Sequence, residues 1–303
     1  MAARPFVDQP VGDVDAARSL AEGVARRLDL PQPTLVRVGM NALFRAGDVV
    51  VRVGRPSAPP ELAIELAHRL HEHGIAAPTP AAQEAYVDSD AFVDGDLAAT
   101  CWVPLAGTGE PIDWREVGAI VRRVHELTPD DLPVGYPLPA PTSFPWWDFD
   151  ALMVDVGTEI DEVARSGLQT AIARNAAWRG LDGARVVCHG DVHPGNVMTT
   201  AGGPVLIDWD LMCVAPPGWD HAMLLTLAER WGGDAGAYPV FAGGYGQSLA
   251  DDAATRRFAE LRNVAATLMR VRAGRTDPAA RAEAELRLRY WRGDADAPMW
   301  HAQ

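Results

Sequence analysis

The residues with the clearest chemical potential lie close together in the sequence, between His189 and Asp208. The segment holds two carboxylates and one amide, from Asp191, Asn196 and Asp208, on the two sides of a Gly202-Gly203 turn. The apolar residues before and after that turn are typical of a β-hairpin. A hairpin centred there places Asn196 opposite Asp208, with their Cα atoms about 4.5–5.5 Å apart.

An amide oxygen and a carboxylate at that separation suit Mg²⁺, which takes hard oxygen ligands and keeps several waters. Asp191 lies upstream on a loop punctuated by Gly and Pro, so it reaches the same cleft. The three side chains suit phosphoryl transfer: Asn196 and Asp208 hold Mg²⁺ on nucleotide phosphates, while Asp191 orients an acceptor hydroxyl and accepts its proton late. Aspartate is a weak base, with a reference pKa of about 3.9, but a loose transition state depends more on positioning than on basicity.

The spacing of these residues resembles two motifs of the aminoglycoside phosphotransferase family, small-molecule kinases with the protein-kinase-like fold. Residues 189–196 match HGDxxxxN, and residues 207–209 match I-D-[FW], in the expected order. The resemblance covers the whole chain. It implies that Asp191 is the catalytic base and that Asn196 and Asp208 are the metal ligands.

The same resemblance implies further roles. His189 bonds the loop backbone, and Asp220, twelve residues after Asp208, braces the catalytic loop. Residues 101–105 form a hinge in which Trp102 and Val103 contact the nucleotide base. The resemblance leaves ATP or GTP open as the donor, and it also leaves the acceptor open, because family members act on aminoglycosides, other antibiotics, amino alcohols and sugars.

The phosphate-binding side departs from the family pattern. The strand at 49–53 normally carries a Lys, but this chain contains no lysine and offers Arg52 instead. Arginine keeps the charge and forks onto phosphate oxygens, although its head is larger. Glu61 and Glu65 both lie near the place expected for its acidic partner, and Asn41 belongs to a short phosphate loop with few glycines.

Two other functions stay open at this level. Because Arg52 replaces the usual Lys, one alternative is a pseudokinase that binds nucleotide without turnover. The other is a metal-dependent hydrolase, since His189, Asp191 and His193 form an H-x-D-x-H pattern that a first-row metal could use.

The composition narrows the ligands and the location. The 303 residues include 27 Arg and 41 acidic residues, a formal charge of −14. An acidic chain is unsuited to general nucleic-acid binding and favours a cationic, hydroxylated acceptor.

The three cysteines are widely spaced, which predicts neither a disulfide framework nor a zinc site. No apolar run approaches the roughly 18 residues of a membrane span, so we expect a cytoplasmic protein without membrane contact. We expect the attractive field at the acceptor site to come from six acids of the second half: Asp148, Asp150, Asp155, Glu159, Asp161 and Glu162.

The elements that must position these residues form an α+β chain of two lobes. Residues 1–104 are expected to form a nucleotide-binding N-lobe, with a helix at 13–29, a helix between Pro60 and Gly74, and a five-stranded antiparallel sheet. Residues 105–303 are expected to form a mostly helical C-lobe that carries the catalytic loop, the metal site and the acceptor site. Alternating and helical patterns predict strands at 34–38, 43–45, 49–53, 91–93 and 97–103, and helices at 113–127, 148–165, 168–179, 219–231, 251–273 and 278–291.

Overall fold

A five-stranded antiparallel sheet forms the base of the first lobe. The computed structural model of the chain describes residues 11–81, 92–180 and 183–301. The strands follow the order β1-β2-β3-β5-β4 across the sheet. Their bounds are β1 (Thr34–Val38), β2 (Ala42–Ala46), β3 (Val49–Gly54), β4 (Val93–Asp94) and β5 (Leu97–Trp102). The predicted strands are therefore confirmed to within two residues, except that Ala91 of the predicted fourth strand lies outside the described residues.

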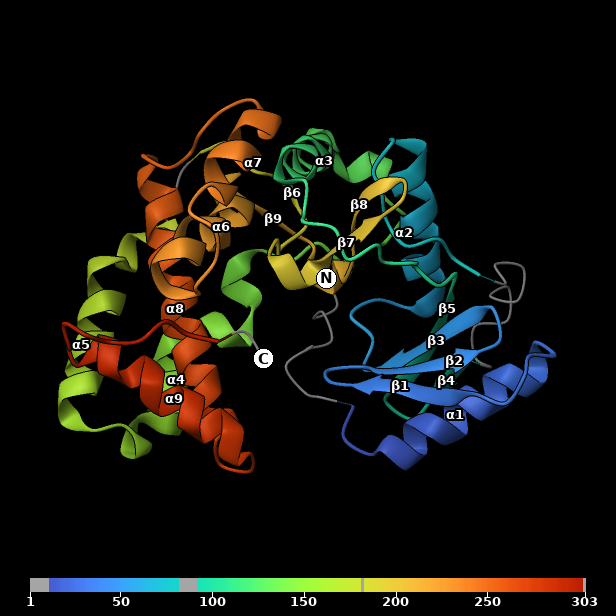
Figure 1. Cartoon of the computed structure of the whole chain (residues 1–303), viewed down its shortest axis with the longest axis horizontal. Helices are drawn as coiled ribbons and strands as arrows, with labels where there is room; N and C mark the ends of the chain where they lie inside the picture. Colours follow the sequence, from blue (N-terminus) through green and yellow to red (C-terminus); the bar gives the residue numbers. More distant parts are fainter. Residues whose placement is uncertain (1–10, 82–91, 181–182, 302–303) are drawn as a thin grey trace.

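One helix covers the sheet on the side away from the second lobe (Figure 1). Helix α1 (Val14–Arg27) begins at Asp13, whose carboxylate accepts from the Asp15 and Ala16 backbone N–H groups. Its buried face, with Leu20 and Val24, packs against strand residues such as Phe44. Alternate strand residues point toward this small core, which fixes the face that each strand turns outward.

Helix α2 (Pro60–Glu72) connects the two lobes. Its residue Ile64 belongs to the core of the sheet, whereas Leu66 and Leu70 pack into a core of the second lobe. Gly74 ends the helix with φ of +68°, as the sequence predicts for a C-terminal cap.

The second lobe is mostly helical and lies across from the sheet in Figure 1. A two-stranded sheet joins β6 (Val186–Cys188) to β9 (Cys213–Ala215), and a hairpin joins β7 (Val197–Thr200) to β8 (Gly203–Leu206). Around them pack α3 (Trp114–Glu126), α4 (Phe149–Val156), α5 (Glu162–Arg174), α6 (Gly218–Arg230), α7 (Ala237–Tyr245), α8 (Ala253–Ala273) and α9 (Pro278–Trp291). The expected α+β architecture, with a five-stranded antiparallel sheet in one lobe and mostly helices in the other, is confirmed.

The prediction of the α4–α5 region is wrong. We expected helices at 148–165 and 168–179, but α4 ends at Val156, a 3₁₀ turn covers Gly157–Glu159, and α5 occupies Glu162–Arg174. Asp161 causes the restart, since its carboxylate caps the N–H groups of Val163 and Ala164.

Helix α7 is absent from the sequence prediction because its sequence contains Pro239, Gly243 and Gly244, which disfavour helices. Packing overrides that preference. A Cβ atom on Gly244 would lie 1.8 Å from the carbonyl oxygen of Arg115, and one on Gly118 would lie 2.0 Å from that of Phe241. Helices α3 and α7 thus cross so closely that only glycine fits at the contact.

No helix in the described ranges is long and apolar enough to cross a bilayer.

Candidate active site

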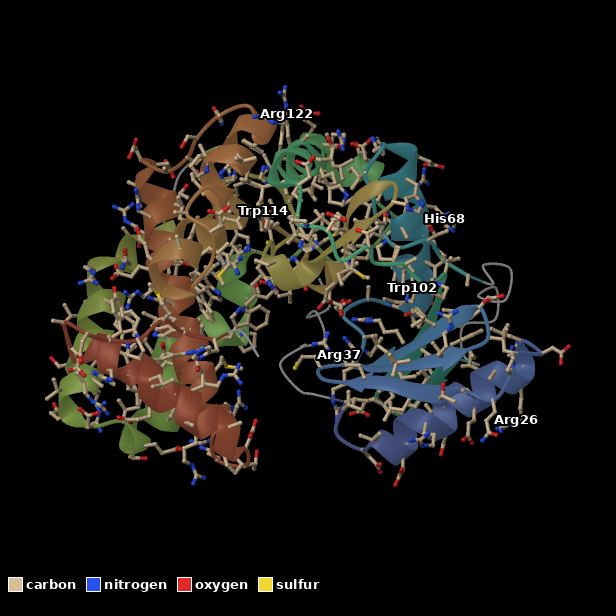
Figure 2. The ribbon with its side chains drawn as sticks, viewed as in Figure 1. Arg26, Arg37, His68, Trp102, Trp114 and Arg122 are labelled. Carbon is tan, nitrogen blue, oxygen red and sulfur yellow. The ribbon has the colours of Figure 1, made fainter. Side chains whose placement is uncertain are left out.

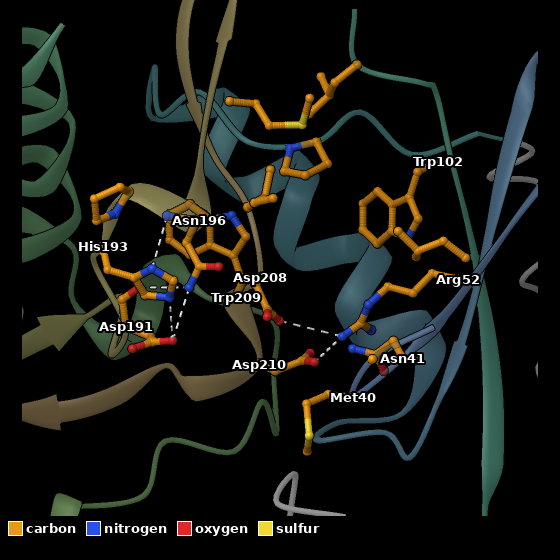
Figure 3. Close-up of a pocket in the computed structure, with 18 of the residues that line it drawn as sticks. Met40, Asn41, Arg52, Trp102, Asp191, His193, Asn196, Asp208, Trp209 and Asp210 are labelled. Carbon is orange, nitrogen blue, oxygen red and sulfur yellow. Dashed lines mark hydrogen bonds and ion pairs between the residues drawn. The ribbon is translucent and has the colours of Figure 1, made fainter. Parts of the chain in front are cut away.

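One large pocket lies between the lobes, with a volume of about 1060 Å³. Its walls come from β1–β3, the segment after β5, the loop before β7 and the segment after β8 (Figure 3). In Figure 2, Arg37 lies at the edge of the sheet that faces the helical lobe, whereas Arg26 on α1 points away from it. The pocket is lined by seven of the nine predicted site residues: Asn41, Arg52, Trp102, Val103, Asp191, Asn196 and Asp208.

The β7–β8 hairpin brings the proposed metal ligands together, but in a register different from the predicted one. Val197 faces Leu206 and Thr200 faces Gly203, so the turn is Ala201-Gly202, one residue earlier than expected. Gly203, with φ of +104°, closes this turn, which an L side chain would strain. Asn196 therefore does not face Asp208 directly.

Asp208 still reaches the pocket because the backbone turns sharply after the hairpin. The Ile207 N–H donates to the Asn196 carbonyl oxygen at 3.0 Å, which extends the ladder by one residue. Asp208 then adopts the left-handed conformation, with φ of 65° and ψ of 63°. Such a backbone is strained for a residue other than glycine, and strain of this kind concentrates at functional sites.

Asp191 lies among positively charged and amide groups. Asn196 Nδ2 donates to its carbonyl oxygen at 2.9 Å and to its Oδ2 at 3.1 Å. His193 Nε2 lies 3.3 Å from Oδ2, and Arg262 Nη1 lies 3.3 Å from Oδ1. Burial alone would raise the pKa of Asp191, but the His193 ring and the Arg262 guanidinium outweigh it and hold that pKa well below its usual range. The carboxylate is therefore ionised and fixed in direction.

Arg262 is a site residue that the sequence analysis missed. It lies on α8, and its guanidinium also donates to the Gly190 carbonyl oxygen at 2.7 Å and covers the Trp219 ring with its carbon 4.9 Å from the ring centroid. No local motif marks it, because its contact with Asp191 spans 71 residues of chain. Only the packing of α8 against the loop at residues 189–196 brings it there.

Beneath the loop at residues 189–196, a fully buried carboxylate binds the backbone. Asp220 accepts from the N–H groups of His189 at 2.9 Å and Gly190 at 2.8 Å, and His125 Nε2 lies 3.1 Å from its Oδ2. Burial would raise the pKa of Asp220, but His125 and these hydrogen bonds lower it. The geometry fits the bracing role that the resemblance implied.

His189 is committed to the backbone through both ring nitrogens. Nε2 lies 3.1 Å from the Ile207 carbonyl oxygen, and Nδ1 accepts from the Asp191 N–H at 3.3 Å. His193 is likewise engaged, because its Nδ1 accepts from the Gly195 N–H at 3.0 Å and its Nε2 faces Asp191. These contacts count against the hydrolase alternative, which needs imidazole nitrogens directed at a metal.

Arg52 projects from β3 into the pocket and meets two carboxylates. Its Nη2 contacts Asp210 and lies 3.6 Å from Asp208 Oδ1. Burial would lower the pKa of Arg52, but the two carboxylates raise it, so the guanidinium stays charged. Burial and the neighbouring Asp210 raise the pKa of Asp208 to about 6, against the opposing effect of Arg52.

The expected partners of Arg52 on α2 do not reach it. Glu65 pairs with Arg69 at 3.4 Å, and Glu61 Oε2 is buried without a hydrogen-bond partner within the described ranges. The expectation that Glu61 or Glu65 pairs with Arg52 is therefore wrong, and Asp210 has that place. The sequence offered one sign of it, an acid two residues after Asp208.

The residues present fit a divalent cation. Because Asn196 commits its Nδ2 to Asp191, its oxygen is the atom left for a ligand. Asp208 adds a carboxylate that lines the same pocket. The raised pKa of Asp208 reflects crowding with Asp210 and Asp191, a local excess of negative charge that a cation would relieve.

At the end of β5, the ring N–H of Trp102 and the backbone N–H of the following Val103 already have partners within the chain. The Val103 N–H donates to the Thr79 carbonyl oxygen at 2.8 Å, and Trp102 Nε1 donates to Thr100 Oγ1 at 2.8 Å. The Trp102 ring and the exposed Val103 side chain nevertheless line the pocket. On the same side of the pocket, Asn41 lies next to Arg52 (Figure 3).

The acids expected to attract a cationic acceptor do not line the pocket. Arginines neutralise most of them, and Asp148 caps α4 through the Ala151 N–H. The acid–arginine pairs are Asp150 with Arg179, Asp155 with Arg272 and Arg275, Glu159 with Arg275, Asp161 with Arg292, and Glu162 with Arg165. Exposed pairs of this kind contribute little field at a distance.

A β-sheet lobe that faces a helical lobe across one pocket is the architecture of the protein-kinase-like phosphotransferases, which confirms the predicted fold. Within that class, the chain belongs to the phosphotransferase enzyme family (APH), whose model matches residues 41–261. No curated protein matches the sequence significantly.

Three solved structures illustrate the shared fold. An amicoumacin kinase in complex with AMP-PNP, Ca²⁺ and Ami has a TM-score of 0.68 at 14% identity, covering 94% of this chain and 97% of that one. The GDP and kanamycin complex of a phosphotransferase of the APH(2″) type has a TM-score of 0.67 at 14% identity, covering 91% and 99%. A choline/ethanolamine kinase family protein from Mesorhizobium loti has a TM-score of 0.63 at 14% identity, covering 93% and 96%. At these identities the likeness establishes the fold.

Proposed function

We propose that this protein transfers the γ-phosphoryl group of ATP or GTP to a hydroxyl of a small molecule. The observation that carries the proposal is the convergence of Asp191, Asn196, Asp208 and Arg52 on one pocket from both lobes. Similar structures hold adenine or guanine nucleotides, which supports a nucleoside triphosphate as donor and leaves both bases open.

The residues divide the work of an in-line transfer. Asp191 accepts a hydrogen bond from the acceptor hydroxyl and takes its proton as the bond from that oxygen to the γ-phosphorus forms and the bond to the nucleotide's bridging oxygen breaks. The diphosphate leaves with the electron pair of the broken bond. Asn196 and Asp208 would hold Mg²⁺, which neutralises charge on the phosphates. Arg52 donates to phosphate oxygens through its planar head.

Asp191 is suited to aim a hydroxyl rather than to store a proton. Its low pKa makes it a poor base in the ground state, and its contacts with Asn196 and Arg262 fix the direction of its free lone pairs. The proton therefore moves late, when the attacking oxygen has already lost most of its basicity to phosphorus.

The far wall of the pocket indicates an acceptor with an apolar face. Trp114, Met223, Leu227 and Trp231 line it together with one exposed carboxylate, that of Asp234. Because the acids expected to create a cationic site are neutralised elsewhere, apolar contact has better support in the structure than charge attraction.

Two measurements test the function. Mg²⁺-dependent thermal stabilisation by ATP or GTP tests the nucleotide site, and an ADP- or GDP-release screen tests transfer to an acceptor. The screen should include aryl-bearing alcohols, amino alcohols, aminoglycosides and sugars. A chain that binds nucleotide with Mg²⁺ but releases no diphosphate with any acceptor, or with water, would be the pseudokinase. A chain that binds neither nucleotide would contradict the proposal.

A further inference from the structure

The acid that holds Arg52 comes from the opposite lobe. Arg52 lies on β3 of the sheet, whereas Asp210 lies in the 3₁₀ turn Trp209–Leu211 that follows β8. Arg52 Nη2 donates to Asp210 Oδ2, and Figure 3 shows the two side chains directed at each other across the pocket. The contact joins residues 158 positions apart.

A second group holds the same carboxylate. Ser57, in the loop between β3 and α2, donates through Oγ to Asp210 Oδ1 at 3.2 Å. Each oxygen of Asp210 thus has one donor from the sheet lobe. A carboxylate whose two oxygens both accept hydrogen bonds loses little further freedom when a ligand binds, which is the requirement for a positioning group.

Helix α2 supplies no acidic partner for Arg52 within the described residues. Glu65 is directed to Arg69, and Glu61 makes no ion pair in the part of the chain that the structure describes. In protein kinases the cation of the third strand is oriented by a glutamate of the neighbouring helix. Here that helix supplies no such contact.

We propose that Asp210 is the positioning residue that orients Arg52 toward the nucleotide phosphates. The inference rests on the proposed function and deepens it. A guanidinium carries five N–H donors, and within the described residues both carboxylate contacts run through Nη2. The Nε and Nη1 donors are left for phosphate oxygens, so the guanidinium of Arg52 can bond to Asp210 and to the nucleotide at the same time.

This arrangement ties the cation to the closure of the two lobes. Asp210 follows Asp208 by two residues, so one short turn carries both the metal-site carboxylate and the hold on Arg52. A glutamate near the start of α2, where Ile64 packs in the core of the sheet, would hold the cation whatever the distance between the lobes. An acid on the far lobe holds it only when the two walls of the pocket meet, and so couples phosphate recognition to assembly of the metal site.

A double-mutant cycle tests the coupling. The variants are Asp210→Asn, Arg52→Ala and the double variant, with Glu65→Gln as a matched loss of one carboxylate. Each is assayed for ATP and GTP affinity with Mg²⁺ by calorimetry and for basal diphosphate release with water as the acceptor. Asp210→Asn should lower kcat by about tenfold or more and change KM for nucleotide by less than about threefold. The reason is that the Arg52 guanidinium loses its orientation but keeps its positive charge. Glu65→Gln should match wild type.

The decisive result is non-additivity. In the Arg52→Ala background, Asp210→Asn should reduce kcat by less than about twofold, since nothing remains to be oriented. An equal loss in both backgrounds, or a tenfold rise in the Mg²⁺ requirement of Asp210→Asn with Arg52 intact, would overturn the inference and make Asp210 a metal ligand instead. If Asp210→Asn fails to fold, Ser57→Ala tests the same contact and should lower kcat about two- to fivefold in the wild-type background alone. A wild type that binds neither nucleotide would refute the function itself, whereas active wild type with unaffected Asp210→Asn would refute only this inference.

Discussion

Replacement of Asp220 by asparagine should lower both the stability of the protein and its turnover. The substitution keeps the shape of the side chain but turns one acceptor oxygen into a donor. Asp220 is fully buried and receives three hydrogen bonds, two at Oδ2 from His189 and His125 and one at Oδ1 from Gly190. The amide is better placed with its oxygen at the Oδ2 position, where it keeps two hydrogen bonds. Its NH₂ group then takes the Oδ1 position, where it faces the N–H of Gly190 and the third hydrogen bond is lost.

The magnitude follows from these contacts. With the amide turned this way, two buried donors lose their acceptor, the Gly190 N–H and one amide N–H, at about 1–3 kcal/mol each. At roughly 2–4 °C per kcal/mol for chains of this size, the combined loss of about 2–6 kcal/mol should lower the Tm by roughly 4–24 °C. Turnover measured well below that Tm should fall about tenfold or more, because the released backbone carries Asp191.

The matched control is Asp113→Asn at the start of α3. Asp113 accepts from the N–H groups of Arg115 and Glu116 at 3.0 and 3.1 Å in an exposed cap, where asparagine serves about as well as aspartate. Its Tm should change by about 1 °C or less. If Asp220→Asn unfolds within 2 °C of this control, or keeps more than half of wild-type turnover, then the buried carboxylate does not support the catalytic loop as argued.

Three further outcomes are expected. Asp191→Asn should keep nucleotide affinity within about threefold and lower single-turnover transfer by about 10² or more, the usual effect of a positioned base; a variant with a third of wild-type transfer would exclude that role. Since Asp208 takes up a proton below pH about 6, Mg²⁺ binding followed by calorimetry should weaken about tenfold per pH unit below that value and level off above it, and a flat profile would count against Asp208 as ligand. Gly244→Ala should lower the Tm because its Cβ would meet the Arg115 carbonyl oxygen, whereas Gly157→Ala, with open space and φ of −63°, should not; equal melting of the two would show that the α3–α7 crossing yields easily.

Most of the correct sequence predictions rest on patterns that lie within a few consecutive residues. Strand alternation near Phe44 and Val51 has a period of two, and the Asp191–Asn196 spacing fits within one loop, so each is visible in a few consecutive residues. The hairpin was predicted one residue out of register because either glycine of the Gly202-Gly203 pair could have closed the turn. The choice depends on backbone conformation, which composition does not reveal.

The features that sequence reasoning missed are long-range. Arg262 reaches Asp191, and Asp210 reaches Arg52, only after distant helices and strands have packed. The same packing explains α7, since a glycine pair that disfavours an isolated helix is what allows α3 to approach it. In α7, the tertiary contact overrides a low local helix propensity.

The three cysteines have a practical consequence for measuring motion of the lobes. Cys101, Cys188 and Cys213 are all fully buried, so reagents do not reach their thiols in the folded chain, and burial also raises the pKa of the Cys188 thiol well above its ordinary value. Thiol-directed dyes and spin labels should therefore leave the folded native chain unmodified. A cysteine introduced at exposed Asp48, in the β2–β3 turn, and another at exposed Val154, on α4, would be labelled alone, and the distance between the two labels would follow the opening of the pocket directly.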